Sequence, residues 1–323
     1  MSSPVGFTLS APPVLSRSVV MRDEPIRTDR ERQLAGWPKA RLVVLDEGGR
    51  TPVEWGDVRG PRDRWDMIDG SGARLLTRPT TGDAPPDDAV LLGEHDGIAY
   101  WAIRGQVDLV AGEDPTDWAD LRTVGAALDA LGAGLLTGAV AVLNWHAAAQ
   151  FCTRDGSPMH PRNAGWHRVC EGGGHEEYPR TDPAVICLVH DGADRVLLAR
   201  QPVWPEGRFS VLAGFVEAGE SLEACVLREI HEEVGAVVRD VRYLGSQAWP
   251  FPRSLMIGFH AQADPDVPLF LADGEIAEAM WVTRAELREA LADGDWSAGA
   301  KRLLLPGRVS IARSMLESWA AQN

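Results

Sequence analysis

One stretch, Gly214–Ala236 (GFVEAGESLEACVLREIHEEVGA), decides how the C-terminal half of the chain folds. Glycines in its first turn allow backbone conformations that a side chain would forbid. Ser221 is a favourable N-cap, no Pro or Gly interrupts the thirteen positions after it, and Gly235 is typical of a helix end. The stretch therefore predicts a turn, a helix over Leu222–Val234 and a second turn.

The predicted helix has an apolar stripe and an acidic face. At about 100° per residue, four apolar side chains share one side and three glutamates lie beside them. Carboxylates this close repel one another, and Arg228 can offset part of the repulsion through Glu232. Clustered carboxylate oxygens also suit Mg²⁺ or Mn²⁺; the alternative is an ordinary solvated acidic face. The two sets are Val226, Leu227, Ile230 and Val234, and Glu229, Glu232 and Glu233.

The spacing of these residues matches the pattern G-x5-E-x7-R-E-U-x-E-E-x-G-U, where U is apolar. The stretch therefore resembles an intact Nudix box. The resemblance implies an α/β/α sandwich with a mixed sheet, and hydrolysis of a nucleoside diphosphate linked to another group. Periodicity alone indicates only an amphipathic acidic helix.

A second motif, SQAWPFPRS, follows at Ser246–Ser254. Each Pro fixes its own φ and constrains the residue before it, so the segment is stiff, and stiff aromatics make stacking surfaces for bases. The alternative is a Pro-rich loop that packs on the core. The segment resembles the SQPWPFPxS signature of the NADH pyrophosphatase (NudC-like) branch of Nudix hydrolases, except that Ala248 replaces a Pro. This branch hydrolyses NAD(H) to nicotinamide mononucleotide and AMP, and some members remove NAD caps from RNA.

The resemblance implies roles for individual residues. The carbonyl oxygen of Ala213 and the carboxylates of Glu229 and Glu233 would bind the metal ions. Glu232 would be a ligand or a base that orients water, and Glu275 would supply an acidic group from a later loop. The implied catalytic residues are Glu229, Glu232, Glu233 and Glu275. The implied substrate-binding residues are Phe215, Tyr178, Gln247, Ala248, Trp249, Pro250, Phe251, Pro252, Arg253, Ser254 and Ala312.

Tyr178 would reach the substrate of the neighbouring subunit, so the resemblance also implies a homodimer. The segment before Tyr178 is rich in Gly, His and Arg and corresponds to a four-cysteine zinc ribbon in the family. Only Cys152 and Cys170 match its ligands, because the other two positions hold Asp155 and Gly173. Two cysteines, Asp155 and a nearby His175 could in principle hold Zn²⁺. We nevertheless expect a degenerate ribbon without zinc.

The length of 323 residues predicts more than one domain. We expect an α+β chain with a strand-rich N-terminal α/β domain over residues 1–150, a zinc-ribbon-like connector over 151–180 and the Nudix domain over 181–323. In the N-terminal part, Asp114–Ala130 and Gly134–Gln150 have helical patterns, while Ala40–Leu45 reads as a strand. No motif there indicates a chemical role.

Composition limits the function classes. The net charge of −15 argues against a chain that coats nucleic acid, although one nucleotide held through a metal fits it. We expect no membrane span and no signal peptide, and therefore a cytoplasmic enzyme. The main alternatives are a Nudix hydrolase acting on NAD-capped RNA or ADP-ribose, and a non-catalytic nucleotide sensor. A sensor is expected to lose box glutamates, and all are present.

Overall fold

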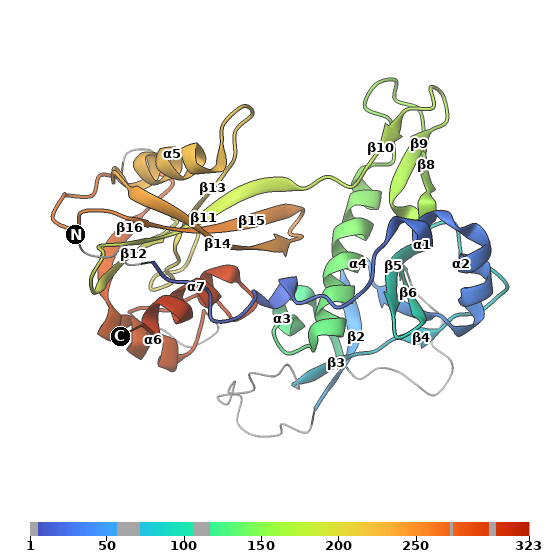
Figure 1. The fold of residues 1–323 in the computed structure, drawn as a ribbon, viewed down its shortest axis with the longest axis horizontal. Helices are drawn as coiled ribbons and strands as arrows, with labels where there is room; N and C mark the ends of the chain where they lie inside the picture. Colours follow the sequence, from blue (N-terminus) through green and yellow to red (C-terminus); the bar gives the residue numbers. More distant parts are fainter. Residues whose placement is uncertain (1–5, 57–71, 106–116, 272–273, 297–301, 323) are drawn as a thin grey trace. The chain divides into compact units, whose positions relative to one another are not determined.

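The computed structural model describes the whole chain except residues 1–5, 57–71, 106–116, 272–273, 297–301 and 323. It divides into two compact units, each described here by itself (Figure 1). Unit 1 comprises Met1–Ser16, Asp182–Ala248 and Ser254–Asn323, and unit 2 comprises Arg17–Thr181 and Trp249–Arg253. The three-domain division at residues 150 and 180 stays a prediction, and the units differ from it in the placement of the first sixteen residues.

Unit 1 is built on a six-stranded mixed sheet in the order β14-β15-β11-β12-β16, with β13 paired to β11. Strand β11 is parallel to β15 and antiparallel to β12 and β13, and β12 is antiparallel to β16. The strands are β11 (Asp182–His190), β12 (Arg195–Arg200), β13 (Leu212–Phe215), β14 (Arg239–Trp249), β15 (Ser254–Gln262) and β16 (Glu278–Thr283).

Helices cover both faces of this sheet. Side chains of β11 alternate between the faces, as the two-residue period of a strand requires. Val185, Cys187 and Val189 share a core with α5 (Leu222–Val234). Ile186 and Leu188 share the opposite core with α7 (Ile311–Ala320), beside α6 (Arg284–Asp293). Figure 1 shows α5 on one side of the sheet and α6 and α7 on the other. The predicted α/β/α sandwich is confirmed.

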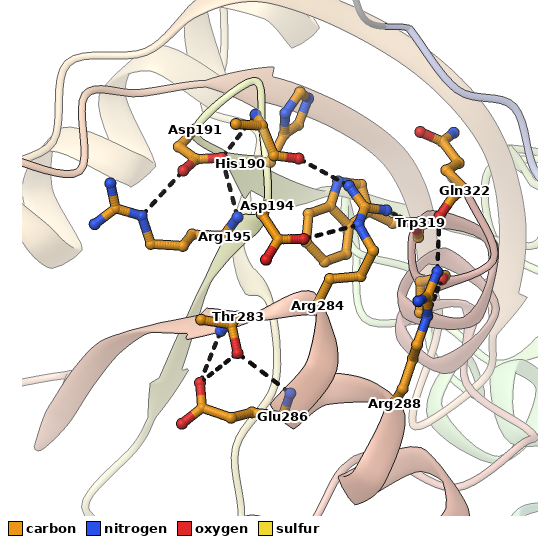
Figure 2. Close-up of polar contacts among 12 residues, drawn as sticks. His190, Asp191, Asp194, Arg195, Thr283, Arg284, Glu286, Arg288, Trp319 and Gln322 are labelled. Atoms are coloured by element: carbon orange, nitrogen blue, oxygen red, sulfur yellow. Dashed lines mark hydrogen bonds and ion pairs between the residues drawn. The ribbon is translucent and has the colours of Figure 1, made fainter.

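Polar contacts join the β11–β12 turn to α6 and α7 (Figure 2). Asp191 accepts hydrogen bonds from Arg195, and Arg284 contacts Asp194 at 3.3 Å while its guanidinium lies 3.8 Å above the Trp319 ring. A capping box begins α6: the backbone N–H of Thr283 donates to Glu286, whose own N–H donates to the Thr283 hydroxyl. These contacts fix the C-terminal helices against the sheet.

Besides the connector ribbon described below, the described part of unit 2 contains two small sheets and a long helix. The sheet orders are β4-β1-β6-β5 and β3-β2-β7. The strands are β1 (Arg41–Leu45), β2 (Arg50–Trp55), β3 (Ala73–Leu75), β4 (Arg78–Pro79), β5 (Val90–His95), β6 (Ile98–Arg104) and β7 (Asp117–Asp120). The helices are η1 (Val14–Ser16, in unit 1), α1 (Glu24–Thr28), α2 (Arg30–Gly36), η2 (Trp37–Lys39), α3 (Leu121–Val124) and α4 (Ala130–Ala148).

The helix predicted over Asp114–Ala130 is wrong as one continuous element: among the described residues of this stretch, only Leu121–Val124 (α3) and Ala130, the first residue of α4, are helical, and residues 114–116 lie outside the described part. Asp117–Asp120 form strand β7, because they pair with β2 in register, Ala119 opposite Thr51. Asp120 then caps the short α3 and Asp129 caps α4. The second predicted helix exists, but it begins earlier than Gly134 because of the Asp129 cap.

Among the described helices, α4 alone is long enough and apolar enough in composition to cross a membrane. However, 67% of the apolar stretch of α4 is buried inside the fold, as is usual for the core helix of a soluble protein.

The connector forms a three-stranded antiparallel ribbon, β10-β9-β8. Its elements are β8 (Met159–Arg162), η3 (Asn163–Gly165), β9 (His167–Cys170) and β10 (Glu176–Glu177). Cys152, Met159 and Cys170 form its small core. The predicted zinc-ribbon-like connector is therefore present as a fold.

Candidate active site

The acidic motif lies on β13, the following turn and α5. The Ser221 hydroxyl accepts from the backbone N–H of Ala224 at 3.2 Å, as predicted for the N-cap. The helix ends at Gly235, whose φ of 70° is left-handed. In the turn, the Glu220 carboxylate accepts from the backbone N–H of Glu217 at 2.7 Å. These local contacts fix the backbone that carries the glutamates.

Arg228 is the centre of the acidic cluster. Its guanidinium contacts the carboxylates of Glu220 at 2.5 Å, Glu229 at 2.9 Å and Glu232 at 3.0 Å. It also donates to the carbonyl oxygen of Phe215 at 3.0 Å. The predicted pair between Arg228 and Glu232 is confirmed. One arginine thus ties the turn, β13 and two glutamates of α5 together.

Glu229 packs directly on β13. A Cβ atom built on Gly214 would lie 1.9 Å from Cδ of Glu229 and 2.1 Å and 2.2 Å from its oxygens. No side chain fits at position 214 while Glu229 holds this position. The glycine of the motif is therefore required by the glutamate as well as by the turn.

Burial raises the pKa of Glu229, and the charges of Glu232 and Glu275 raise it further, against the opposing effect of Arg228. Glu275, in the loop before β16, is thus electrostatically coupled to the helix carboxylates.

Glu233 is only 3% exposed, whereas the side chain of Glu232 is about half exposed. These carboxylates repel one another, and a hard divalent cation bound by their oxygens would relieve the repulsion. The residues therefore fit Mg²⁺ or Mn²⁺. Ala213 lies beside them on β13, partly exposed.

Five of the implied substrate-binding residues belong to unit 1. Phe215 is 59% exposed at the end of β13. Gln247 is buried and donates to the carbonyl oxygen of Val309 at 3.0 Å. Ala312 is also buried, and its backbone N–H donates to Ser310 at the start of α7. The remaining two, at the ends of β14 and β15, are the partly exposed Ala248 and Ser254.

The aromatic loop Trp249–Arg253 belongs to unit 2. Its Trp249 and Phe251 rings meet edge to face at 4.9 Å, and the guanidinium of Arg122 lies 3.9 Å from the Phe251 ring centroid. Asn144 donates to the carbonyl oxygen of Pro250 at 3.4 Å. Within the loop, Pro250 is buried, Phe251 is partly exposed, and Pro252 and Arg253 are exposed.

Arg122 and Asn144 are residues that the sequence reasoning missed. Neither belongs to a motif, and both lie far from the loop in sequence. Only the fold places them beside it, so no local pattern could have identified them.

Tyr178 lies in unit 2, just after the ribbon, and is 55% exposed. Its hydroxyl donates to Glu176 at 2.7 Å, and this hydrogen bond raises the pKa of Tyr178. Its ring stacks at 5.5 Å from that of His167. The exposed aromatic face agrees with a binding role, which stays a prediction.

The ribbon brings together four possible metal ligands: Cys152, Asp155, Cys170 and His175. Their ligand atoms all lie within 4.8 Å of one another. Hydrogen bonds, first from the backbone of Ser157, lower the pKa of Asp155 to about 2, so the carboxylate is charged. Only Cys152 and Cys170 match the family's ligand positions in the sequence, as expected. In the fold, however, Asp155 and His175 lie close enough to complete a set of four ligands.

The sandwich and its acidic helix define a hydrolase of the Nudix superfamily. The NUDIX domain family matches residues 180–303, and the NADH pyrophosphatase zinc ribbon domain matches residues 147–178. The NAD-capped RNA hydrolase NudC of Mycobacterium tuberculosis is 52% identical over 322 residues, which cover 99% of this chain and 98% of that protein. The chain belongs to the NudC-like NADH pyrophosphatase family.

Other relatives are more distant. The mitochondrial NAD(P)H pyrophosphatase NUDT13 of Homo sapiens is 40% identical over 210 residues, which cover 63% of this chain and 59% of that protein. Among solved structures, a NUDIX hydrolase from Nitrosomonas europaea has a TM-score of 0.37 and 23% identity, covering 42% of this chain and 79% of that one.

Proposed function

We propose that this enzyme hydrolyses the pyrophosphate bond of NAD(H) to nicotinamide mononucleotide and AMP, with Mg²⁺ or Mn²⁺ as the divalent cation. The observation that carries the proposal is the acidic cluster on α5: Arg228 contacts both Glu229 and Glu232, and the charge of Glu275 raises the pKa of Glu229. Full-length similarity to a NudC protein supports the choice of dinucleotide.

The carboxylates of Glu229, Glu232, Glu233 and Glu275 and the carbonyl of Ala213 would hold the cations. When bound, Mg²⁺ or Mn²⁺ would offset the charge of the pyrophosphate, polarise its P–O bonds and lower the pKa of water. Arg228 holds Glu229 and Glu232 in place through its guanidinium. This arrangement is preorganised, because the arginine fixes both carboxylates before substrate arrives.

The bond-breaking step needs one base. A water oxygen attacks one phosphorus, the bridging P–O bond breaks, and the departing monophosphate carries the electron pair. A carboxylate of Glu232, Glu233 or Glu275 accepts the water proton. All three remain candidates: Glu232 is exposed, Glu233 is buried, and Glu275 is exposed on a separate loop.

Two aromatic surfaces are available for the bases of the dinucleotide. Phe215, one residue after Gly214, is 59% exposed, and its carbonyl oxygen accepts a hydrogen bond from Arg228 of the acidic cluster. Tyr178 presents a second face, and we propose that it reaches the substrate of a partner subunit in a homodimer. A planar nicotinamide held between two aromatic faces gains stacking energy from both.

NAD-capped RNA is the second candidate substrate, since the relative that is 52% identical is named an NAD-capped RNA hydrolase. The net charge of −15 argues against extensive contacts with the RNA backbone beyond the cap. ADP-ribose and a non-catalytic sensor role are weaker alternatives.

Steady-state kinetics on NADH, NAD⁺, ADP-ribose and a short NAD-capped RNA, each with Mg²⁺ and with Mn²⁺, tests the proposal. We expect kcat/KM to be highest for NADH or NAD⁺, with AMP as a product. A preference for ADP-ribose of tenfold or more would favour that alternative. Turnover confined to capped RNA would make decapping the function, and absence of turnover on all four would support a sensor.

A further inference from the structure

The ribbon of unit 2 holds a cluster of metal-ligating side chains that catalysis does not use. Sγ of Cys152 lies 3.3 Å from Nδ1 of His175, and Sγ of Cys170 lies 3.4 Å from both carboxylate oxygens of Asp155. Asp155 and His175 are 3.5 Å apart. Thus the two thiols, the carboxylate and the imidazole meet at one point.

These separations agree with a tetrahedral zinc site. With Zn–S near 2.3 Å and Zn–N or Zn–O near 2.0–2.1 Å, neighbouring ligand atoms are about 3.4–3.8 Å apart. Two of the three separations, 3.4 Å and 3.5 Å, fall within this range, the third, 3.3 Å, lies just below it, and all four ligand atoms lie within 4.8 Å of one another. Only small side-chain movements are needed to surround an ion.

The structure at Gly173 shows how His175 can replace the fourth cysteine of the family. The family's fourth cysteine falls on Gly173, which has no side chain. A Cβ built on Gly173 would lie 2.5 Å from Cε1 and 2.9 Å from Nε2 of His175. The imidazole therefore occupies the space that a side chain at 173 would enter. A glycine at 173 and a histidine at 175 are structurally complementary.

The cluster also has supporting contacts of the kind that orient metal ligands. The backbone N–H of Gly173 donates to Sγ of Cys170 at 3.3 Å. The backbone N–H of Ser157 donates to Asp155 at 2.9 Å. Such contacts fix a ligand's orientation and favour its charged form.

We propose that Cys152, Asp155, Cys170 and His175 bind one Zn²⁺, with the fourth ligand displaced from position 173 to position 175. This reverses the expectation drawn from sequence register. The site is closed by four protein ligands, so its role is to hold the ribbon together rather than to catalyse. The proposal does not depend on the substrate of unit 1.

Metal analysis of the full-length chain, purified without chelator and dialysed, tests the proposal. We expect about one zinc per chain. After replacement of zinc by Co²⁺, we expect the visible absorption of tetrahedral cobalt together with thiolate-to-cobalt charge transfer. His175→Ala should lower the zinc content at least tenfold and abolish these bands.

His160→Ala is the matched control, because His160 is an exposed histidine of the same ribbon, paired with Glu171 at 3.2 Å. It should keep full zinc and the cobalt spectrum. The double variant Gly173→Cys/His175→Ala restores the family's fourth ligand position and should regain zinc, which guards against simple misfolding of the single variant.

Two results would overturn the proposal. One is wild-type protein that holds less than about one tenth of a zinc per chain and shows no tetrahedral spectrum when Co²⁺ is supplied. The other is His175→Ala protein that keeps wild-type zinc and an unchanged cobalt spectrum, since the fourth ligand would then not be His175.

Discussion

The carboxylate of Glu229 occupies the space beside the backbone of Gly214 that any larger residue would need. A Cβ on Gly214 would lie 1.9 Å from Cδ of Glu229. This contact joins β13, which carries Ala213 and Phe215, to the acidic face of α5. The glycine and the glutamate of the motif therefore depend on each other, because the strand sets the position of the Glu229 carboxylate.

Gly214→Ala should lower kcat about 100-fold, because the new methyl group displaces the Glu229 carboxylate and small misplacements of this kind are costly. Stability should change little, since the displaced group is the end of a flexible side chain. NADH turnover and thermal unfolding measure the two effects.

Gly36→Ala is the control: Gly36 has a φ of −81° and no atom within 4 Å of a built Cβ. Full activity in Gly214→Ala would refute the coupling.

Arg122→Ala should weaken NADH binding, because Arg122 lies over Phe251 and 5.1 Å from the Trp249 ring. Cation–π contacts are worth about 0.5–1 kcal/mol at exposed sites, so we expect KM to rise roughly two- to fivefold. Arg122→Lys keeps the charge but loses the planar stack, and should be intermediate. An unchanged KM in both variants would mean that this contact does not position the loop for binding.

Acid should destabilise unit 1 through the buried pair His190 and His260, whose rings are hydrogen-bonded at 3.1 Å. Burial, followed by the charges of His260 and Arg284, lowers the pKa of His190 to about 4, against the opposing effect of Asp191. The unfolded histidine, with a pKa near 6.5, binds a proton that the folded one rejects. Stability is therefore complete above about pH 6.5 and is lost as the pH falls towards 4.

Urea unfolding between pH 4 and pH 7 measures this dependence. His190→Gln should flatten it, whereas the exposed His160→Gln should leave it as in wild type. An identical slope in His190→Gln and wild type would assign the acid sensitivity to other groups.

Shared active sites in a homodimer can be tested by mixing Tyr178→Ala and Glu233→Gln chains, each nearly inactive alone. If Tyr178 serves the partner's site, a mixed dimer has one intact site. Random exchange of equal amounts should then restore about half a site per dimer. Subunit exchange, followed with differently tagged chains, is the control. If subunits exchange and no activity returns, either Tyr178 and Glu233 of one chain serve the same active site, or Tyr178 lies outside the active site.

The sequence predicted features that depend on neighbouring residues. The limits of α5, its cap at Ser221 and its end at Gly235 follow from local preferences. Local patterns failed where distant pairing decides the structure. Asp117–Asp120 are helical in pattern but form β7, since β2 offers a partner strand. The meeting of Asp155 with His175 and of Arg122 with Phe251 depends on chain folding that no spacing rule encodes.

The central claim is that the α5 glutamates support hydrolysis of NAD(H), and product analysis with NADH and Mg²⁺ tests it most directly. Wild type should yield equal amounts of AMP and reduced nicotinamide mononucleotide. Glu233→Gln, which removes one charge from the proposed metal cluster, should lower kcat by several orders of magnitude while thermal unfolding stays close to wild type. Glu223→Gln, an exposed glutamate in the first turn of the same helix, should keep full activity. Absence of both products with wild type, or Glu233→Gln turnover within a few-fold of it, would contradict the account.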